Sequence, residues 1–197
     1  NQLLNAGVGS LDGVLYTHSH ADHVHGLDDL RMIFFNMRKR IDVWADQATQ
    51  NDLIERFKYA FVQPDDSPYP PILNLNTLDG ITELYGDGGP INFFPFQVKH
   101  GNVNALGFRI GPLVYLPDVS EMSKEAWEEV NKAKCWILDA LRRNPHPSHS
   151  HLENSLEWIK TSGIERAILT NMHVDLDYET LIQETPKNVE PAFDGIV

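Results

Sequence analysis

Residues 15–26 read Leu15-Tyr16-Thr17-His18-Ser19-His20-Ala21-Asp22-His23-Val24-His25-Gly26. Four potential metal ligands fall within six positions of this segment: His18, His20, Asp22 and His23. The apolar run 14–16 predicts a buried strand, and the segment from His23 onward predicts a helix. The ligands then lie on the turn between the two elements, where alternate residues of an extended chain point the same way. His18 and His20 can therefore share one metal, and Asp22 and His23 can face a second.

The residue types of this motif indicate a metal site rather than a solvated surface, because no lysine or arginine stands among them. Imidazole and carboxylate groups bind zinc and also harder ions such as manganese or iron. The motif therefore predicts metal binding without selecting the ion.

The composition is that of a globular chain. At 197 residues with 42% hydrophobic content, one domain with a sizeable core is the default. The formal net charge is −12, and the densest basic run is Arg38-Lys39-Arg40. Proteins that bind long nucleic acids usually carry a continuous basic surface, and this acidic sequence does not suggest one. A long nucleic acid is therefore not expected as a partner. A small phosphorylated substrate remains compatible with an acidic chain if bound metals supply the positive charge.

The single cysteine, Cys135, lies in the apolar run 135–138, which predicts a buried thiol and excludes an intrachain disulfide. This usage fits a reducing compartment. No apolar run approaches the length of a membrane span, and no signal peptide is visible. The expectation is a cytoplasmic protein with no membrane partner.

Predicted strands and helices alternate along the rest of the chain, which is typical of the α/β class with mixed sheets. The predicted strands cover residues 41–45, 91–99, 105–110, 113–116, 135–139 and 166–170. The predicted helices cover 46–61, a segment behind Ser123 as N-cap, and a segment from a capping box at Ser150 and Glu153 to Gly163. The irregular segment 63–90 is expected to be a flap or to contain short edge strands.

Two further ligand candidates stand at the ends of predicted strands. His100 closes the run 94–99, and Asp118 closes the run 113–117. Taken alone, each residue is better explained as structural, since a strand-end carboxylate can cap the next helix. The first motif already indicates a metal site, and loops that leave rigid strands often carry functional residues. Together these two observations favour a functional role for both His100 and Asp118.

The order His-x-His-x-Asp-His, strand-end His, strand-end Asp and late His resembles the ligand set of the metallo-β-lactamase fold hydrolases. The resemblance covers nearly the whole chain. More narrowly, the chain is similar to the branch that contains the phosphoribosyl 1,2-cyclic phosphate phosphodiesterase. The stretches that carry this similarity are 17–23, 26–31, 138–142, 145–149, 168–170 and 175–178.

The resemblance implies an αββα sandwich of two mixed sheets in one domain spanning residues 1–197. It also implies two divalent metal ions, zinc or manganese. His18, His20 and His100 would hold the first ion, Asp22, His23 and a late His would hold the second, and Asp118 would bridge them around a hydroxide. Asp22 and His149 would be the catalytic residues, with His149 assisting the leaving group. His149 and His151 would contact the substrate, and His146 is a weaker alternative.

Two departures from the family pattern stand out. The late ligand in many relatives is a His directly after the strand-ending Thr, and Asn171 occupies that position here. In an extended segment His173 would point the same way, so His173 is the predicted late ligand. Relatives also begin with several strands before the motif, which starts here at about residue 15. We therefore expect the N-terminal strands of one sheet to be missing from this sequence.

The expected activity is hydrolysis of a small (cyclic) phosphodiester or nucleotide-like substrate, with His149 donating a proton to the leaving alkoxide. Three alternatives stay open: a thioester or lactone hydrolase, a nuclease resembling the transfer-RNA 3′-processing enzymes, and a non-catalytic nucleotide-binding module. The acidic charge disfavours the nuclease, and Asn171 is the main support for the binding module. His20 stands where the diiron branch has Glu, which argues against redox chemistry. Many proteins of this fold dimerise, so the resemblance allows a homodimer.

Overall fold

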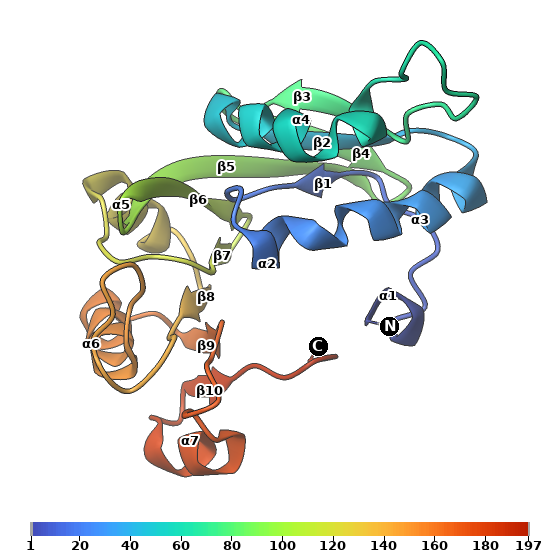
Figure 1. The fold of residues 1–197 in the computed structure, drawn as a ribbon. Helices are drawn as coiled ribbons and strands as arrows, with labels where there is room; N and C mark the ends of the chain where they lie inside the picture. Colours follow the sequence, from blue (N-terminus) through green and yellow to red (C-terminus); the bar gives the residue numbers. More distant parts are fainter. Residues whose placement is uncertain (1, 197) are drawn as a thin grey trace. The chain divides into compact units, whose positions relative to one another are not determined.

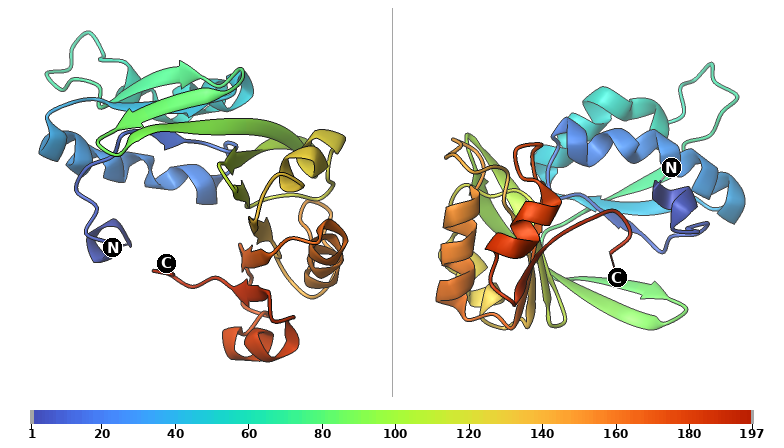
Figure 2. Two further views of the ribbon diagram at one scale, coloured as in Figure 1. Left: turned by 180° about the vertical axis from the view of Figure 1, so that it is seen from behind. Right: turned by 90° about the horizontal axis from the view of Figure 1, so that it is seen from below.

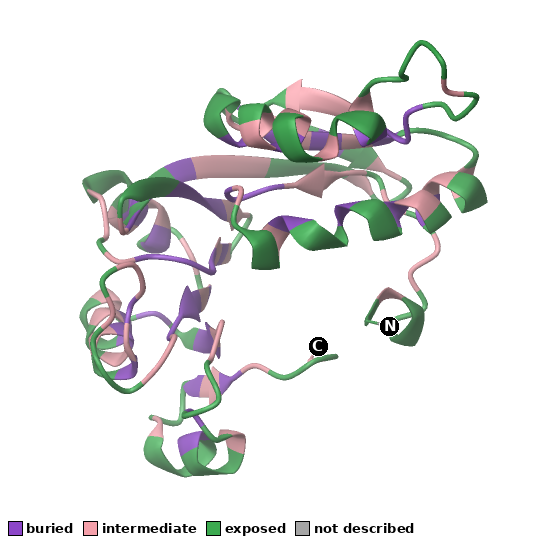
Figure 3. Ribbon diagram, in the orientation of Figure 1, coloured by how far each residue is buried: buried purple, intermediate pink, exposed green. Residues whose placement is uncertain are grey.

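The computed structural model describes residues 2–196, and it divides into two compact units, residues 1–91 and residues 92–197 (Figure 1). Each unit is described by itself. In the second unit most of the buried residues lie in strands, and in both units the outer faces of the helices are exposed (Figure 3). Within residues 2–196, no helix is both long enough and apolar enough to cross a bilayer.

The first unit contains a three-stranded parallel sheet of order β1-β2-β3. Its strands are β1 (Val14–Leu15), β2 (Ile41–Ala45) and β3 (Leu73–Thr77). Parallel neighbours need a crossover, and helices on the intervening segments supply one between each pair. Both described strand pairs of this sheet are parallel, whereas a mixed sheet was predicted.

The helices of this unit follow the predictions in outline. They are α1 (Gln2–Asn5), α2 (Ala21–Val24), the 3₁₀ helix η1 (His25–Asp29), α3 (Leu30–Met37) and α4 (Gln47–Phe61). The single helix predicted after the motif is broken by η1, which contains Gly26; glycine weakens an α-helix by roughly 1 kcal/mol. Asp46 caps α4 by accepting a hydrogen bond from the Thr49 amide at 2.8 Å.

The core of the first unit forms where β2 meets α3 and α4. Alternate residues of β2 are buried, and Leu30, Ile33 and Leu53 of the two helices pack with them. The segment 63–90 contains β3, β4 (Thr82–Gly86) and the start of β5, which confirms the prediction of short strands there.

The second unit is built on a mixed sheet, as predicted. Its order is β10-β9-β8-β7-β6-β5. The strands are β5 (Gly89–His100), β6 (Val103–Ile110), β7 (Leu113–Leu116), β8 (Cys135–Asp139), β9 (Arg166–Thr170) and β10 (Val189–Pro191). β5 and β7 are both antiparallel to β6, whereas β7 to β10 are parallel. The carboxyl ends of β5, β7, β8 and β9 therefore lie at the same edge of the sheet.

Three helices accompany this sheet: α5 (Lys124–Val130), α6 (Leu152–Ser162) and α7 (Tyr178–Glu184). α6 runs beside the strands (Figure 2) and buries Leu152 and Ile159 in the core around Trp136. Ser123 caps α5 through a 3.0 Å bond from the Ala126 amide, and Gly163 ends α6 at φ 66°, both as predicted.

Two local predictions for this unit are wrong. Ser150 does not cap α6; the N-cap position belongs to His151, and the Ser150 hydroxyl instead bonds the Ser155 hydroxyl at 2.7 Å. Cys135 is only half-buried, because it lies at the start of β8, where the strand enters the sheet. Burial still raises the pKa of its thiol.

Candidate metal centre

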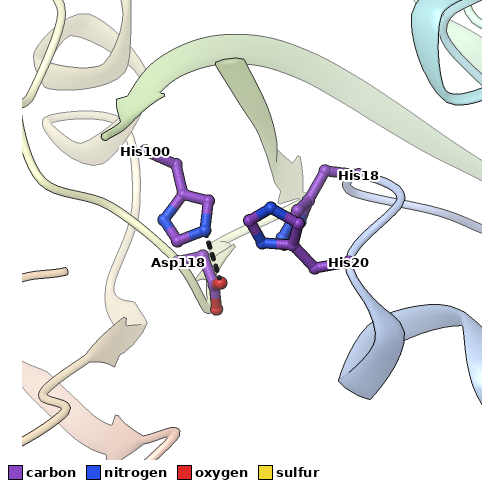
Figure 4. A group of neighbouring side chains, drawn as sticks. All are labelled: His18, His20, His100 and Asp118. Carbon is purple, nitrogen blue, oxygen red and sulfur yellow. Dashed lines mark ion pairs between the residues drawn. The ribbon is translucent and has the colours of Figure 1, made fainter. Parts of the chain in front are cut away.

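The loop after β1 gathers the ligand candidates of the first unit. The rings of His18 and His20 lie 4.6 Å apart between centroids, and those of His18 and His23 lie 4.4 Å apart. The Nε2 atom of His23 is 3.2 Å from Oδ2 of Asp22. His18 is buried, whereas His20 and Asp22 are exposed (Figure 4 draws His18 and His20). The predicted clustering of imidazoles on this turn is therefore present.

A contact with α4 holds this loop in place. The Ser19 hydroxyl donates a hydrogen bond to Asp52, and Arg56 donates from Nη1 to the Ser19 carbonyl at 2.6 Å. Arg56 also pairs with Asp52 at 3.7 Å, one helical turn away. Nothing in the sequence pointed to this support beyond the i, i+4 spacing of an acid and a base, which is common on exposed helices.

In the second unit, His100 at the end of β5 meets Asp118 just beyond β7. Their Nε2 and Oδ2 atoms are 3.3 Å apart, and both side chains are 1% exposed (Figure 4). The Nδ1 atom of His100 is 2.7 Å from the Ser148 carbonyl, which can only accept, so Nδ1 carries the hydrogen. In neutral His100 the Nε2 lone pair then faces a carboxylate oxygen. That arrangement is favourable when a cation lies between them, so the donor set fits a metal ion.

His149 and Asp139 form a second pair beside the first. The Nδ1 atom of His149 is 2.9 Å from Oδ2 of Asp139 and 4.0 Å from Oδ2 of Asp118. The ring of His149 also lies 4.6 Å from that of His100. Burial raises the pKa of the Asp139 carboxyl to about 6, although the bond from His149 opposes the rise. His149 is therefore placed beside the buried carboxylates of Asp139 and Asp118.

The two candidates for the late ligand differ in position. Asn171 has φ 58°, and its Nδ2 atom donates to Oδ1 of Asp118 at 2.8 Å. His173 is 59% exposed and its Nδ1 atom lies 3.1 Å from Oδ1 of Asp175. The extended backbone assumed for residues 171–173 is wrong, because the left-handed Asn171 turns the chain. Asn171, rather than His173, is the residue that contacts Asp118.

The remaining histidines of the loop 143–151 have separate contacts. His146 is half-buried and its Nδ1 atom lies 3.2 Å from the Ser148 hydroxyl. His151 is the N-cap residue of α6 and is half-buried. Among the histidines of this loop, His149 is the one placed against the buried carboxylates.

Asp139 is the residue that sequence reasoning passed over. It ends β8 in the same way that His100 ends β5 and Asp118 follows β7. Asp139 could have been found by the feature that identified His100 and Asp118, which is a ligand-type side chain at the carboxyl end of an apolar strand.

Comparison with known proteins identifies the class. Residues 2–172 match the family described as "Beta-lactamase superfamily domain". The chain belongs to the metallo-β-lactamase superfamily, whose characteristic two-sheet fold and His/Asp groups are those described above.

A more specific likeness is to the crystal structure of a "New Diphosphatase from the PhnP Family". It shares 31% identity and a TM-score of 0.87, over 98% of this chain and 73% of that one. The expected similarity to the branch that contains the phosphoribosyl 1,2-cyclic phosphate phosphodiesterase is thereby confirmed. The Bacillus subtilis metallo-β-lactamase fold protein YhfI shares the fold, with a TM-score of 0.73 at 18% identity over 94% of this chain and 76% of that one.

A curated relative has a different name. A Porphyromonas gingivalis protein named "Octanoyltransferase" is 31% identical over 99% of this chain. The present chain spans about two fifths (39%) of the length of that relative. The name describes that longer protein as a whole.

Proposed function

We propose that this chain is a dinuclear metal-dependent hydrolase that cleaves a small phosphodiester, cyclic or nucleotide-like. The observation that carries the proposal is the buried pair of His100 and Asp118, with the imidazole anchored through Nδ1 to the Ser148 carbonyl. An imidazole oriented in this way by a backbone carbonyl is the usual arrangement of a metal-ligating histidine.

The proposal joins the two groups of ligands around two metal ions. His18, His20, His100 and Asp118 would hold one ion, and Asp22, His23 and Asp118 would hold the other. Mixed imidazole and carboxylate donors suit zinc and manganese. When bound, two such ions would lower the pKa of water to supply a nucleophile and would neutralise a phosphoryl oxygen.

The chain's own residues would complete the reaction. His149, beside the ligand pair and held by Asp139, would donate a proton to the leaving oxygen. Asp118 would be kept in place by the bond from Asn171. His151, two residues from His149, would contribute to substrate binding. The net charge of −12 supports a small substrate over a long RNA, so the nuclease alternative is disfavoured.

A second candidate is hydrolysis of an acyl thioester. Its support is the curated relative whose printed name concerns octanoyl transfer, which is acyl chemistry. The same metals would polarise a carbonyl as readily as a phosphoryl group. The likeness to a PhnP-family diphosphatase favours phosphorus over carbon as the centre attacked.

The test combines metal content with turnover on protein purified without chelator. We expect two metals per chain and turnover of bis-p-nitrophenyl phosphate and a 2′,3′-cyclic nucleotide, both lost after chelation. His18→Ala should lose metal and turnover. The matched control is His25→Ala, an exposed histidine seven residues further along. Two metals with turnover of an acyl thioester only would favour the second candidate. One metal or none, with nucleotide still bound, would favour the non-catalytic binding module.

A further inference from the structure

Ser19 stands between the first two histidines of the motif and is bonded to α4 from two of its atoms. Its hydroxyl donates a hydrogen bond to Oδ2 of Asp52, and its carbonyl accepts a 2.6 Å bond from Nη1 of Arg56. The Nη2 atom of Arg56 lies 3.7 Å from the same Oδ2 atom. The three residues therefore form a closed set of contacts, the Ser19 network, and all three belong to the first unit.

The Ser19 network acts on the backbone that orients His18 and His20. His20 is extended, with φ −64° and ψ 152°, and alternate residues of an extended segment point to the same side. The two imidazoles accordingly lie together, with ring centroids 4.6 Å apart, whereas the side chain of Ser19 contacts α4. Holding both the hydroxyl and the carbonyl of Ser19 restricts rotation of the peptides around it. The relative directions of the two imidazoles are therefore restricted as well.

The helix that supplies these contacts is itself fixed in the core of the first unit. Thr49, Leu53 and Ala60 of α4 are buried, so the helix has little freedom to shift. Supporting contacts position a site most accurately when they come from a rigid element of this kind. Asp52 and Arg56 themselves are half-exposed, and such ion pairs contribute little to the stability of a fold. Stability alone is therefore a poor explanation of the network.

We propose that Asp52 and Arg56 are positioning residues that hold Ser19 and thereby raise the affinity of the neighbouring histidines for a divalent metal ion. A ligand pair already held in the binding geometry loses less conformational freedom when the ion binds. Neither residue is a ligand in this role, because both act through Ser19. The inference rests on the metal site of the proposed function and adds to it the contacts that prepare that site.

The charge of Arg56 separates this role from a simple electrostatic effect. A guanidinium near a divalent cation repels it, so charge alone predicts that Arg56→Ala strengthens metal binding. Loss of positioning predicts the opposite sign. We expect Arg56→Ala to raise the Kd for Zn²⁺ by about tenfold, the lower end of the loss seen when a residue that supports a ligand is removed. Competition with a chromophoric chelator measures this Kd.

Two further variants and a control test the network as a whole. Ser19→Ala removes the hydroxyl but keeps the carbonyl that Arg56 holds, so its Kd for Zn²⁺ should rise by less. The double variant Ser19→Ala/Asp52→Ala should bind no more weakly than Asp52→Ala alone, because Asp52 then has no hydroxyl to hold. The matched control is Lys58→Ala, which removes the same charge from an exposed position of α4 and should leave the Kd unchanged.

Hydrogen exchange of the metal-free protein gives a measurement that needs neither metal nor activity. We expect faster amide exchange across residues 18–23 in Arg56→Ala than in the wild type, because the loop is no longer held. The midpoint of urea unfolding should change little. Faster exchange throughout the first unit, with a matching fall in that midpoint, would show a merely structural role and contradict the proposal.

The outcomes for the inference and for the proposed function are distinct. A Kd for Zn²⁺ that is unchanged or lower in Arg56→Ala would overturn the inference, as would an equal effect of Lys58→Ala. A wild-type protein that binds no Zn²⁺ would contradict both. If the wild type binds Zn²⁺ but turns over no phosphodiester, the proposed function is contradicted, whereas weaker binding by Arg56→Ala still supports the positioning role.

Discussion

Asn171 donates a hydrogen bond from Nδ2 to Oδ1 of Asp118 over 2.8 Å, and it does so from left-handed backbone at φ 58°. Asparagine tolerates that conformation better than most residues. The other carboxylate oxygen of Asp118 faces His100 at 3.3 Å. The carboxylate therefore has an amide donor at one oxygen and an imidazole nitrogen facing the other. The resemblance predicts a histidine ligand near this position, whereas the Asn171 amide here bonds the carboxylate of Asp118.

Removing that donor should weaken metal binding. We expect Asn171→Ala to lower the affinity for the more weakly held ion by about tenfold, the scale seen when an outer partner of a ligand is lost. Asn171→His should at least restore it, since histidine supplies a nitrogen and also tolerates left-handed backbone. Competition with a chromophoric chelator measures both. An affinity unchanged in Asn171→Ala would show that Asp118 needs no such support.

His173→Ala decides between the two candidates for the late ligand. His173 is 59% exposed and paired with Asp175, so we expect its removal to leave the metal content unchanged. Elemental analysis after dialysis against a metal-free buffer gives the result directly. Loss of one ion per chain would instead establish His173 as the late ligand, through a movement of residues 171–173.

Glu129 provides a pH-dependent contribution to stability. Burial raises the pKa of its carboxyl, but the bonds from Lys132 and Arg109 outweigh that effect and the net pKa is lowered from 4.5. A lowered folded-state pKa stabilises the protein above the unfolded-state value, and the gain disappears as pH falls through the folded-state pKa. Glu129→Gln should therefore cost about 1 kcal/mol at pH 7 and almost nothing at acid pH.

Urea unfolding of wild type and variant at several pH values tests this dependence. The control is Glu128→Gln, whose partner Lys124 lies 3.7 Å away on an exposed surface. Such pairs contribute little, so this variant should match wild type throughout. A Glu129→Gln defect that is constant with pH would exclude the ion pairs as its cause.

Gly107 lies where the ring of a residue on the neighbouring strand leaves no room for a side chain. Phe96 is its cross-strand partner, and an added Cβ would lie 2.4 Å from two ring atoms of that residue. Because Phe96 is only 2% exposed, the ring has little room to move. We expect Gly107→Ala to lower the free energy of unfolding by about 1–3 kcal/mol, the usual cost of overpacking.

Thermal or urea unfolding measures that loss. Gly88→Ala is the control, because a Cβ there meets nothing within 4 Å. Combining Gly107→Ala with Phe96→Leu should recover part of the stability by making room. A Gly107→Ala variant as stable as wild type would mean that β5 and β6 can separate at this pair without cost.

The class of the protein and the metal motif could be predicted from local order along the chain. Side-chain direction repeats within a few residues of a strand, so short-range features were sufficient. These features are the spacing of the ligands between residues 18 and 23 and the apolar runs that form β2, β7, β8 and β9. The caps at Ser123 and Gly163 are equally local. Each could be assigned without knowing what lies across the sheet.

The partners of the site residues could not be predicted in this way. Asp139 and His149 are joined by a loop whose path no periodicity describes, and Asn171 reaches Asp118 across 53 positions of sequence. Asn171 has left-handed backbone, and His173 lies at the surface beside Asp175. Such contacts depend on which strand ends share an edge of the sheet and on the turn that leaves each one. These are properties of the folded chain, because they arise only when distant segments pack together.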